Sequence, residues 1–196
     1  MKWTSIASAV VVVFVLAGSC RTPAAQAIAW LDRPVVNWNK PGAAVPRGPA
    51  DRSDHDDAME RCKAKPPQTP AAVGVTSAAW VPQTYLDREL IKDDVEILAG
   101  VSGFDSKCAP MEYNLFVFVG GRYAGALSPR PMVPGTDAAA GVVRFGGDGI
   151  TAEFARYQPS DSTCCPSSRV SVRYRVERPA DGPVVVPLDV KTTRSY

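Results

Sequence analysis

The chain has 196 residues, of which 45% are hydrophobic and 21% are charged, and this is enough for one domain with a sizeable core. Its formal net charge of +2 gives no electrostatic argument for nucleic acid as a partner or for a polybasic membrane patch, because both need concentrated positive charge. We predict no nucleic-acid partner. The prolines crowd into residues 23–82, so we expect ordered packing to concentrate in the second half.

The N-terminus has the pattern of an export signal. Residues 6–17 form an apolar run that is shorter than the ~20 residues of a membrane-spanning helix and suits the hydrophobic region of a signal peptide. The run ends at Leu16-Ala17-Gly18-Ser19-Cys20, which resembles the bacterial lipobox. Residues 1–19 are therefore predicted to be a signal peptide, and Cys20 is the predicted lipidation site that anchors the chain to a membrane.

Two alternatives to lipidation remain. Ordinary cleavage after Ala27, at Ala25-Gln26-Ala27, would remove Cys20 with the signal and leave a periplasmic or secreted protein. An uncleaved transmembrane helix is disfavoured, because no charged stop-transfer cluster follows the apolar run.

Residues 20–52 are proline-rich and show no helical or alternating period, which predicts an extended tether or wrapping segment. It contains Trp30 and Trp38. We expect the segment to lie across the domain and bury these rings, because large aromatic side chains rarely stay fully exposed. The alternative is that the rings are anchors at a membrane interface or a partner surface.

The folded domain is predicted to span residues 53–196. It opens with acidic residues that are followed by basic ones, a pattern typical of a helix over residues 54–64 with Ser53 or Asp54 as its cap. His55, the single histidine, lies among these acids. Because contiguous residues point around a helix, we interpret them as a solvated helix start and predict no metal site here.

A run of strands follows. Two glycine-containing turns, at 120–121 and 181–182, and the glycine-rich 146–149 favour antiparallel hairpins. Seven segments have the length and the β-branched or aromatic content of strands, namely 95–104, 114–119, 122–127, 141–145, 150–157, 169–177 and 183–188.

Two of these segments indicate how the sheet is covered. Residues 169–177 alternate between apolar and polar side chains, so this strand should have one wet face. Residues 114–119 are apolar on both faces and should lie centrally. The predicted fold class is mainly β (α+β): an antiparallel meander sheet curled into a half-barrel or sandwich, with one short N-terminal helix. The helix and the tryptophan segment are expected to close an open face.

The cysteines predict disulfides. Without Cys20 the domain keeps an even set in an oxidising compartment, Cys62, Cys108, Cys164 and Cys165. A bond between the two adjacent cysteines is disfavoured, because neighbouring Cα atoms lie ~3.8 Å apart and unstrained disulfides need ~4.4 to 6.8 Å. Each adjacent cysteine is therefore expected to bond to one of the two distant ones. Which of them pairs with which stays open.

The sequence contains no catalytic constellation that we would assign. Ser102 lacks the spacing of a nucleophile elbow, and the single histidine lies in the acidic helix start. Neither zinc spacing nor a dinucleotide or phosphate fingerprint is present. We therefore predict no enzyme activity, no cofactor and no metal.

Residues 122–137 offer a candidate binding surface. It consists of Arg122, Tyr123 and Arg130, the last in a proline-rich excursion over 128–137 that is too long for a tight turn. Such loops often carry function. The alternative is that 128–137 is a plain connection.

Three stretches resemble the bacterial LppP/LprE family of envelope lipoproteins. They are GFDSKCAPMEYNLFVFVGGRYAGALSPRPM, then ITAEFARYQPSDSTCCPSS, then VRYRV. The similarity extends over about residues 30–190, and its most specific element is CCPS after the EFARY strand. It implies an exported, usually lipid-anchored domain of unknown biochemical activity, and it supplies no catalytic residues.

These observations predict a non-enzymatic cell-envelope lipoprotein. Its β domain would bind an envelope protein or a small apolar ligand. The alternative is a secreted or periplasmic protein without a lipid anchor, which binds a small ligand or acts as an inhibitor. A disulfide-dependent hydrolase is a third, weaker hypothesis, because it would need a nucleophile in a pocket.

Overall fold

The computed structural model describes residues 29–49, 52–64, 66–83, 90–147, 149–162 and 164–194. The predicted signal peptide, Cys20 and the alternative cleavage site lie outside these residues. The helical elements are η1 (Trp30–Asp32), α1 (Arg52–Cys62) and α2 (Pro70–Ser77). The strands are β1 (Val81–Gln83), β2 (Leu90–Lys92), β3 (Val95–Val101), β4 (Tyr113–Val119), β5 (Arg122–Ala126), β6 (Ala140–Gly146), β7 (Gly149–Arg156), β8 (Ser168–Glu177) and β9 (Val184–Arg194).

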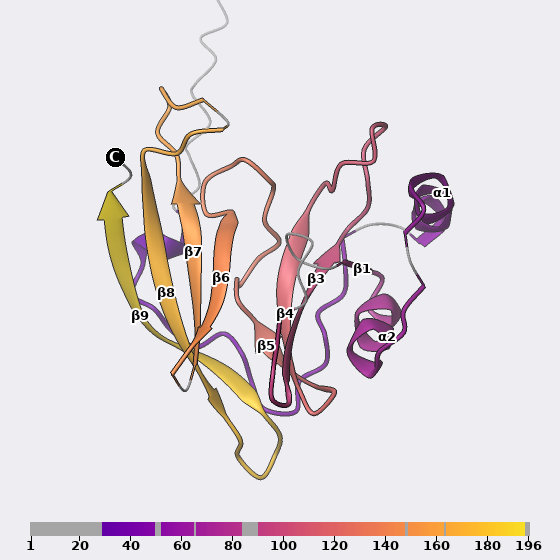
Figure 1. Cartoon of the computed structure of the whole chain (residues 1–196), viewed down its shortest axis with the longest axis horizontal. Helices are drawn as coiled ribbons and strands as arrows, with labels where there is room; N and C mark the ends of the chain where they lie inside the picture. The colour runs from indigo at the N-terminus through magenta and orange to yellow at the C-terminus, as the bar shows by residue number, and fades with distance from the viewer. Residues whose placement is uncertain are drawn as a thin grey trace, which may run out of the picture.

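The strands form two antiparallel sheets that are not closed into a barrel. The first sheet has the order β1-β3-β4-β5, and β2 also pairs with β3. The second sheet is a meander in the order β6-β7-β8-β9. Figure 1 shows the sheets side by side, with α1 and α2 beyond the first sheet. The predicted mainly-β antiparallel fold is confirmed, and of its two forms the structure has the sandwich.

The main core lies between the two sheets. Val117 of the first sheet and Phe154, Val172 and Tyr174 of the second all belong to it, each almost completely buried. These β7 and β8 residues alternate with more exposed ones, as the period-two pattern predicts. The Tyr174 hydroxyl also donates a hydrogen bond to the Leu127 carbonyl, which links the second sheet to the end of the first.

Strand β4 is covered on both faces, as predicted from its continuous apolar sequence. Leu115 and Val117 face the inter-sheet core, whereas Phe116 and Phe118 belong to a second cluster on the outer face. That cluster includes Val75 of α2. The outer face of the first sheet is therefore covered by α2 and not by the predicted helix over 54–64.

Glycines allow one tight turn and one close approach between segments of the fold. Gly120 and Gly121 have φ values of 55° and 75°, the left-handed pair that a tight β4–β5 hairpin turn needs. At Gly125 a Cβ atom would lie 2.4 Å from Cγ of Asn39 and 2.7 Å from Cγ1 of Val185. Only glycine allows the N-terminal segment and β9 to approach β5 this closely.

The N-terminal segment closes one edge of the sandwich. Trp38 donates from Nε1 to the Ala126 carbonyl at 2.9 Å, and Asn39 donates from Nδ2 to the carbonyls of Ala126 and Val185. The ring centroid of Trp30 lies 5.1 Å from that of Phe154 in an edge-to-face contact. Both indoles are partly buried against the core, so the prediction that this segment lies across the domain is confirmed.

Three short elements had no counterpart in the sequence analysis. They are α2, β1 and β2, and each is too short to show a clear period. Thr69 and Pro70 nevertheless carry a helix-start signal, because Thr69 accepts a hydrogen bond from the Ala72 backbone N–H and Pro70 occupies the first helical turn. The predicted helix over 54–64 is present as α1, two residues earlier at each end.

Candidate functional site

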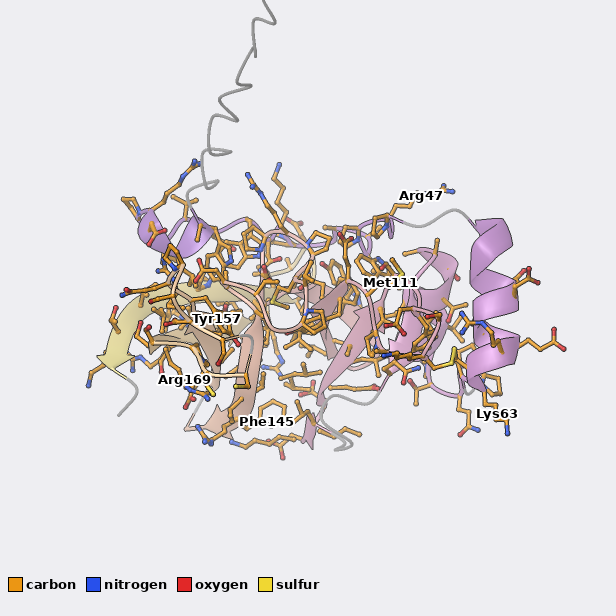
Figure 2. The ribbon with its side chains drawn as sticks, turned by 90° about the horizontal axis from the view of Figure 1, so that it is seen from above. Arg47, Lys63, Met111, Phe145, Tyr157 and Arg169 are labelled. Carbon is orange, nitrogen blue, oxygen red and sulfur yellow. A yellow bond between two sulfur atoms is a disulfide. The ribbon has the colours of Figure 1, made fainter. Side chains whose placement is uncertain are left out.

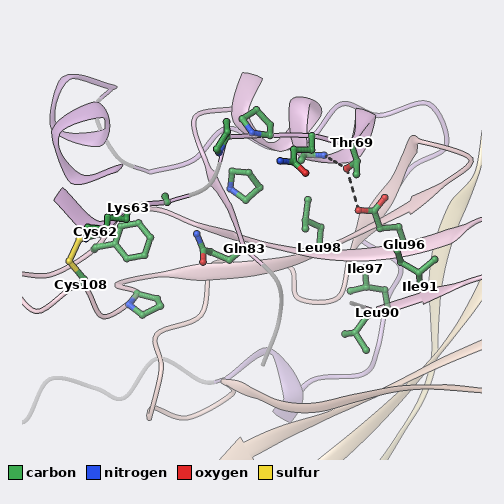
Figure 3. Close-up of a pocket in the computed structure, with 18 residues that line it drawn as sticks. Cys62, Lys63, Thr69, Gln83, Leu90, Ile91, Glu96, Ile97, Leu98 and Cys108 are labelled. Atoms are coloured by element: carbon green, nitrogen blue, oxygen red, sulfur yellow. Dashed lines mark hydrogen bonds between the residues drawn. A yellow bond between two sulfur atoms is a disulfide. The ribbon is translucent and has the colours of Figure 1, made fainter. Parts of the chain in front are cut away.

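A cleft of about 620 Å³ opens where these short elements meet the first sheet. Its wall is formed by the end of α1, the α1–α2 connection, α2, strands β1 to β3 and the loop after β3. Figure 3 shows the Cys62–Cys108 disulfide at one end of the cleft and the pair formed by Thr69 and Glu96 at the other. The cleft lies beside the sandwich core and not inside it.

The wall is mixed, with somewhat more apolar than polar surface. Leu90, Ile97, Leu98 and Phe104 contribute side chains, and several prolines add rigid apolar surface. Ile91 is 54% exposed at the rim. The volume of the cleft lies within the range of sites that bind a small molecule.

A few polar groups lie on the same wall. The Thr69 hydroxyl donates to Oε1 of Glu96 at 3.4 Å, while its oxygen accepts from the Ala72 backbone N–H at 3.1 Å. Gln83 contributes an amide. Thr69 therefore couples the start of α2 to a carboxylate on β3. Gln68 also lines the cleft, as does Lys63 at the disulfide end, so polar groups lie along its whole length.

The disulfide end is held by the loop between β3 and β4. Oδ1 of Asp105 accepts from the backbone N–H groups of Ala109 and Lys107, both at 2.8 Å. These bonds hold the pKa of the Asp105 carboxyl below its usual range. Arg61 of α1 donates to the Asp105 carbonyl at 3.1 Å. The crosslink and this hydrogen bond together fasten α1 to the cleft.

The predicted cysteine pairing is wrong. Cys62 and Cys108 bond to each other, with Cα atoms 5.4 Å apart, so neither is available to Cys164 or Cys165. The adjacent pair lies in the loop between β7 and β8, on the second sheet, while α1 lies beyond the first sheet (Figure 1). The distance across the sandwich excludes the bonds that were predicted.

The two adjacent thiols lie side by side. Their Sγ atoms lie 2.6 Å apart and both residues are exposed. The backbone N–H of Cys165 donates to the Ser162 carbonyl at 3.0 Å, so the segment turns here. This turn brings the two side chains together.

The structure only partly brings together the candidate surface of Arg122, Tyr123 and Arg130. Tyr123 lines a second depression of about 280 Å³ with Ser128 and Pro129 of the predicted loop, but neither arginine lines it. The Tyr123 ring packs edge-on against Phe118 with ring centroids 5.8 Å apart, and burial raises its pKa. This residue thus belongs largely to the outer cluster, and the binding role of the surface stays a prediction.

Neither a cluster of metal ligands nor a membrane-spanning helix is present in the described parts of the chain. No three His, Cys, Asp or Glu side chains among these residues come close enough together to hold a metal ion. No helix within the same residues has the length and apolar character to cross a membrane. The side chain of His55 lies outside the part that the structure describes.

The fold and the cleft define a disulfide-crosslinked, antiparallel β-sandwich with an open cleft beside its first sheet. Residues 96–178 match the model of the LppP/LprE lipoprotein family, which confirms the resemblance seen in the sequence. The match extends from β3 to just after β8 and so includes strands of both sheets. This family suggests an exported, membrane-anchored envelope lipoprotein of unknown function. The comparisons with curated proteins and with solved structures gave no match.

Proposed function

We propose that the protein is an envelope lipoprotein, anchored through lipid on Cys20, whose β-sandwich binds a small apolar ligand without chemical conversion. The observation that carries this proposal is the 620 Å³ cleft beside β1, β2 and β3. Its size falls within the ~300 to 1,000 Å³ that ligand pockets usually have. The LppP/LprE match supports the anchored location.

The chemistry of the wall favours an amphiphile. The apolar part of the ligand would lie on Leu90, Leu98 and the prolines, because contact there removes exposed apolar surface from water. A hydroxyl or amide head group would hydrogen-bond to Gln83 or Glu96. The two cysteines on the wall are bonded to each other and so offer no thiol nucleophile, which supports binding in place of catalysis.

Photolabelling tests the cleft. Membranes containing the full chain are incubated with a primary fatty amide that bears a diazirine in its acyl chain and are then irradiated, and the labelled peptides are mapped by mass spectrometry. We expect label on β2 and β3. Ile91→Asp should reduce it about tenfold, because a carboxylate at the rim must be desolvated when the acyl chain binds.

Leu188→Asp is the matched control. Leu188 is also an exposed apolar strand residue, 43% accessible, but it lies on β9 of the other sheet. It should leave the labelling of β2 and β3 unchanged. Label distributed over both sheets, or equal loss in both variants, would contradict binding in the cleft.

The anchor is tested separately. Metabolic labelling with palmitate should mark the wild-type chain and fail to mark Cys20→Ala. Mass spectrometry of the mature N-terminus distinguishes the alternative, since cleavage after Ala27 would leave Ile28 as the first residue. An unlipidated chain that begins there would be a periplasmic or secreted binding protein with the same cleft.

A further inference from the structure

The loop between β7 and β8 carries two adjacent thiols, and hydrogen bonds within the loop hold it in shape. Cys164 and Cys165 are both exposed, and their sulfur atoms lie 2.6 Å apart. Figure 2 shows Tyr157 and Arg169, which flank this loop, beside the second sheet and far from Lys63 at the end of α1. The pair is therefore separate from the cleft and from the Cys62–Cys108 crosslink.

Asp161 holds the loop in shape. Its carboxylate accepts from the backbone N–H of Gln158 and of Ser167, each at 2.8 Å, and from the Ser167 hydroxyl at 2.5 Å. These bonds tie the two sides of the loop together across the cysteines. The loop grows directly from β7 and β8, whose final register pair is Arg156 with Ser168. The two cysteines thus lie in a loop that is held by the Asp161 hydrogen bonds and by the pairing of β7 with β8.

The surroundings make the two thiols unequal. The Ser162 hydroxyl lies 3.1 Å from Sγ of Cys164. Hydrogen bonds from Cys165 and then from Ser162 lower the pKa of the Cys164 thiol, whereas the hydrogen bond with Cys164 raises the pKa of Cys165. A thiolate is the attacking species in disulfide exchange. Cys164 is consequently the attacking group and Cys165 the group that completes the reaction.

We propose that Cys164 and Cys165 form an exposed dithiol site that undergoes reversible exchange with disulfide-bearing molecules. Sγ of Cys164 attacks one sulfur of the partner disulfide and forms a mixed disulfide, and the first partner thiolate leaves and takes up the proton from Cys164. Sγ of Cys165 then attacks Sγ of Cys164, loses its proton, and expels the second partner thiol. The protein dithiol is oxidised by two electrons, and the partner disulfide is reduced to two thiols.

The product explains why the exchange is reversible. Adjacent Cα atoms are ~3.8 Å apart across a trans peptide, below the ~4.4 to 6.8 Å of unstrained disulfides. A disulfide between Cys164 and Cys165 therefore closes a strained ring. Strained, exposed disulfides are readily reduced. Cys62 and Cys108 have their Cα atoms 5.4 Å apart and should stay bonded under conditions that open the ring.

Equilibration with glutathione tests this site in the full mature chain. Samples at a series of ratios of reduced to oxidised glutathione are alkylated with N-ethylmaleimide and digested with trypsin. Cleavage after Arg156 and Arg169 places both cysteines in one peptide, residues 157–169. We expect the wild-type peptide to change from no label to two labels as the mixture becomes more reducing, while Cys62–Cys108 remains bonded.

The variant Cys165→Ser removes the second step. Its peptide should retain a glutathione adduct on Cys164 at about ten times the wild-type level, since an oriented neighbouring thiol otherwise displaces glutathione rapidly. Cys164→Ser is the matched control and should form less adduct. Circular dichroism verifies that each variant keeps the sheet signal.

Three results would overturn the proposal. The first is two labels at every glutathione ratio, and the second is as much adduct on the wild type as on Cys165→Ser. The third is a ring that opens only together with Cys62–Cys108. Phenylarsine oxide gives an independent readout, because one arsenic atom needs two neighbouring sulfurs. We expect one arsenical per reduced chain, and failure of capture would contradict the juxtaposition on which the exchange depends.

Discussion

The two sheets of the sandwich are built in different ways. The second sheet is a meander of long strands and is the more regular of the two. Its strands β7 and β8 pair over eight consecutive positions without a shift, while one register shift interrupts each of the β6–β7 and β8–β9 pairs. The first sheet is irregular at its outer edge, where β1 and β2 have three residues each and share β3 as their partner. The cleft lies at this irregular edge. Regular pairing thus supports the core around the second sheet, which we call the regular half. Short elements joined by the α2 cap and the Cys62–Cys108 crosslink form the cleft at the edge of the first sheet, which we call the irregular half.

The largest expected effect on the free energy of unfolding lies in the regular half. Phe154 is completely buried between the sheets and contacts Trp30, so Phe154→Ala should lower the free energy of unfolding by ~4 kcal/mol through lost burial and the cavity left behind. Urea unfolding followed by tryptophan fluorescence measures this change. Leu188→Ala, on the exposed surface of β9, should change it by less than ~0.5 kcal/mol. Equal losses would show that the core is not where stability is concentrated.

Loss of the Cys62–Cys108 crosslink should have the next largest effect on stability, and this effect should lie in the irregular half. Cys62 and Cys108 are 46 residues apart in the chain. Replacing both by serine should lower the free energy of unfolding by ~3 kcal/mol, because the unfolded chain regains the entropy that the closed loop had removed. Denaturant unfolding measures the loss. Hydrogen exchange should increase first in α1, and an increase that begins in β7 and β8 would contradict the division between the halves.

Sequence periodicity predicted the regular half well and the irregular half poorly. The alternation of Val170, Val172 and Tyr174 is strong because one face of β8 is buried along its whole length. Strand β9 was predicted to end at 188 but continues to Arg194, because its last residues are polar and give no apolar period. The cleft could not be predicted, since α2, β1 and β2 are too short for a period to develop.

The pairing of the cysteines shows a different limit of prediction from sequence. Local geometry disfavoured a bond between Cys164 and Cys165, but the pairing of all four cysteines depends on which parts of the chain meet after folding. Cys62 is the last residue of α1, and Cys108 lies in the loop that the hydrogen bonds of Asp105 hold beside it. Only the arrangement of the two sheets separates these two cysteines from the adjacent pair.

A smaller effect is expected at the cap of α2. Thr69→Ala removes the side-chain acceptor for the Ala72 backbone N–H and the donor to Glu96. The free energy of unfolding should fall by ~1 kcal/mol, the usual cost of losing an N-cap. Thr192→Ala, an exposed threonine in β9, is the control and should cost less than ~0.5 kcal/mol. A smaller loss at Thr69 than at Thr192 would show that the cap does not hold the cleft wall.

The smallest effect concerns pH and again separates the two halves. In the folded protein the pKa of Asp105 lies below the ordinary value of 3.8, chiefly because its carboxylate accepts backbone N–H bonds from Ala109 and then Lys107. The folded state therefore binds fewer protons than the unfolded state in this range. The resulting stability is present above pH 3.8 and is lost as the pH falls through the lowered folded value.

Asp105→Asn removes this titration while keeping a side-chain acceptor. Above pH 3.8 the wild type should be the more stable protein, because a carboxylate accepts stronger hydrogen bonds than an amide. The difference should shrink as the solution is acidified below that pH. Unfolding curves of both proteins across this range, with hydrogen exchange read at α1 and at β8, measure it. Because Asp105 holds the loop that carries Cys108, the acid-dependent increase in exchange should be confined to α1 and the cleft wall, and an equal increase in β8 would show that the two halves respond to acid as one unit.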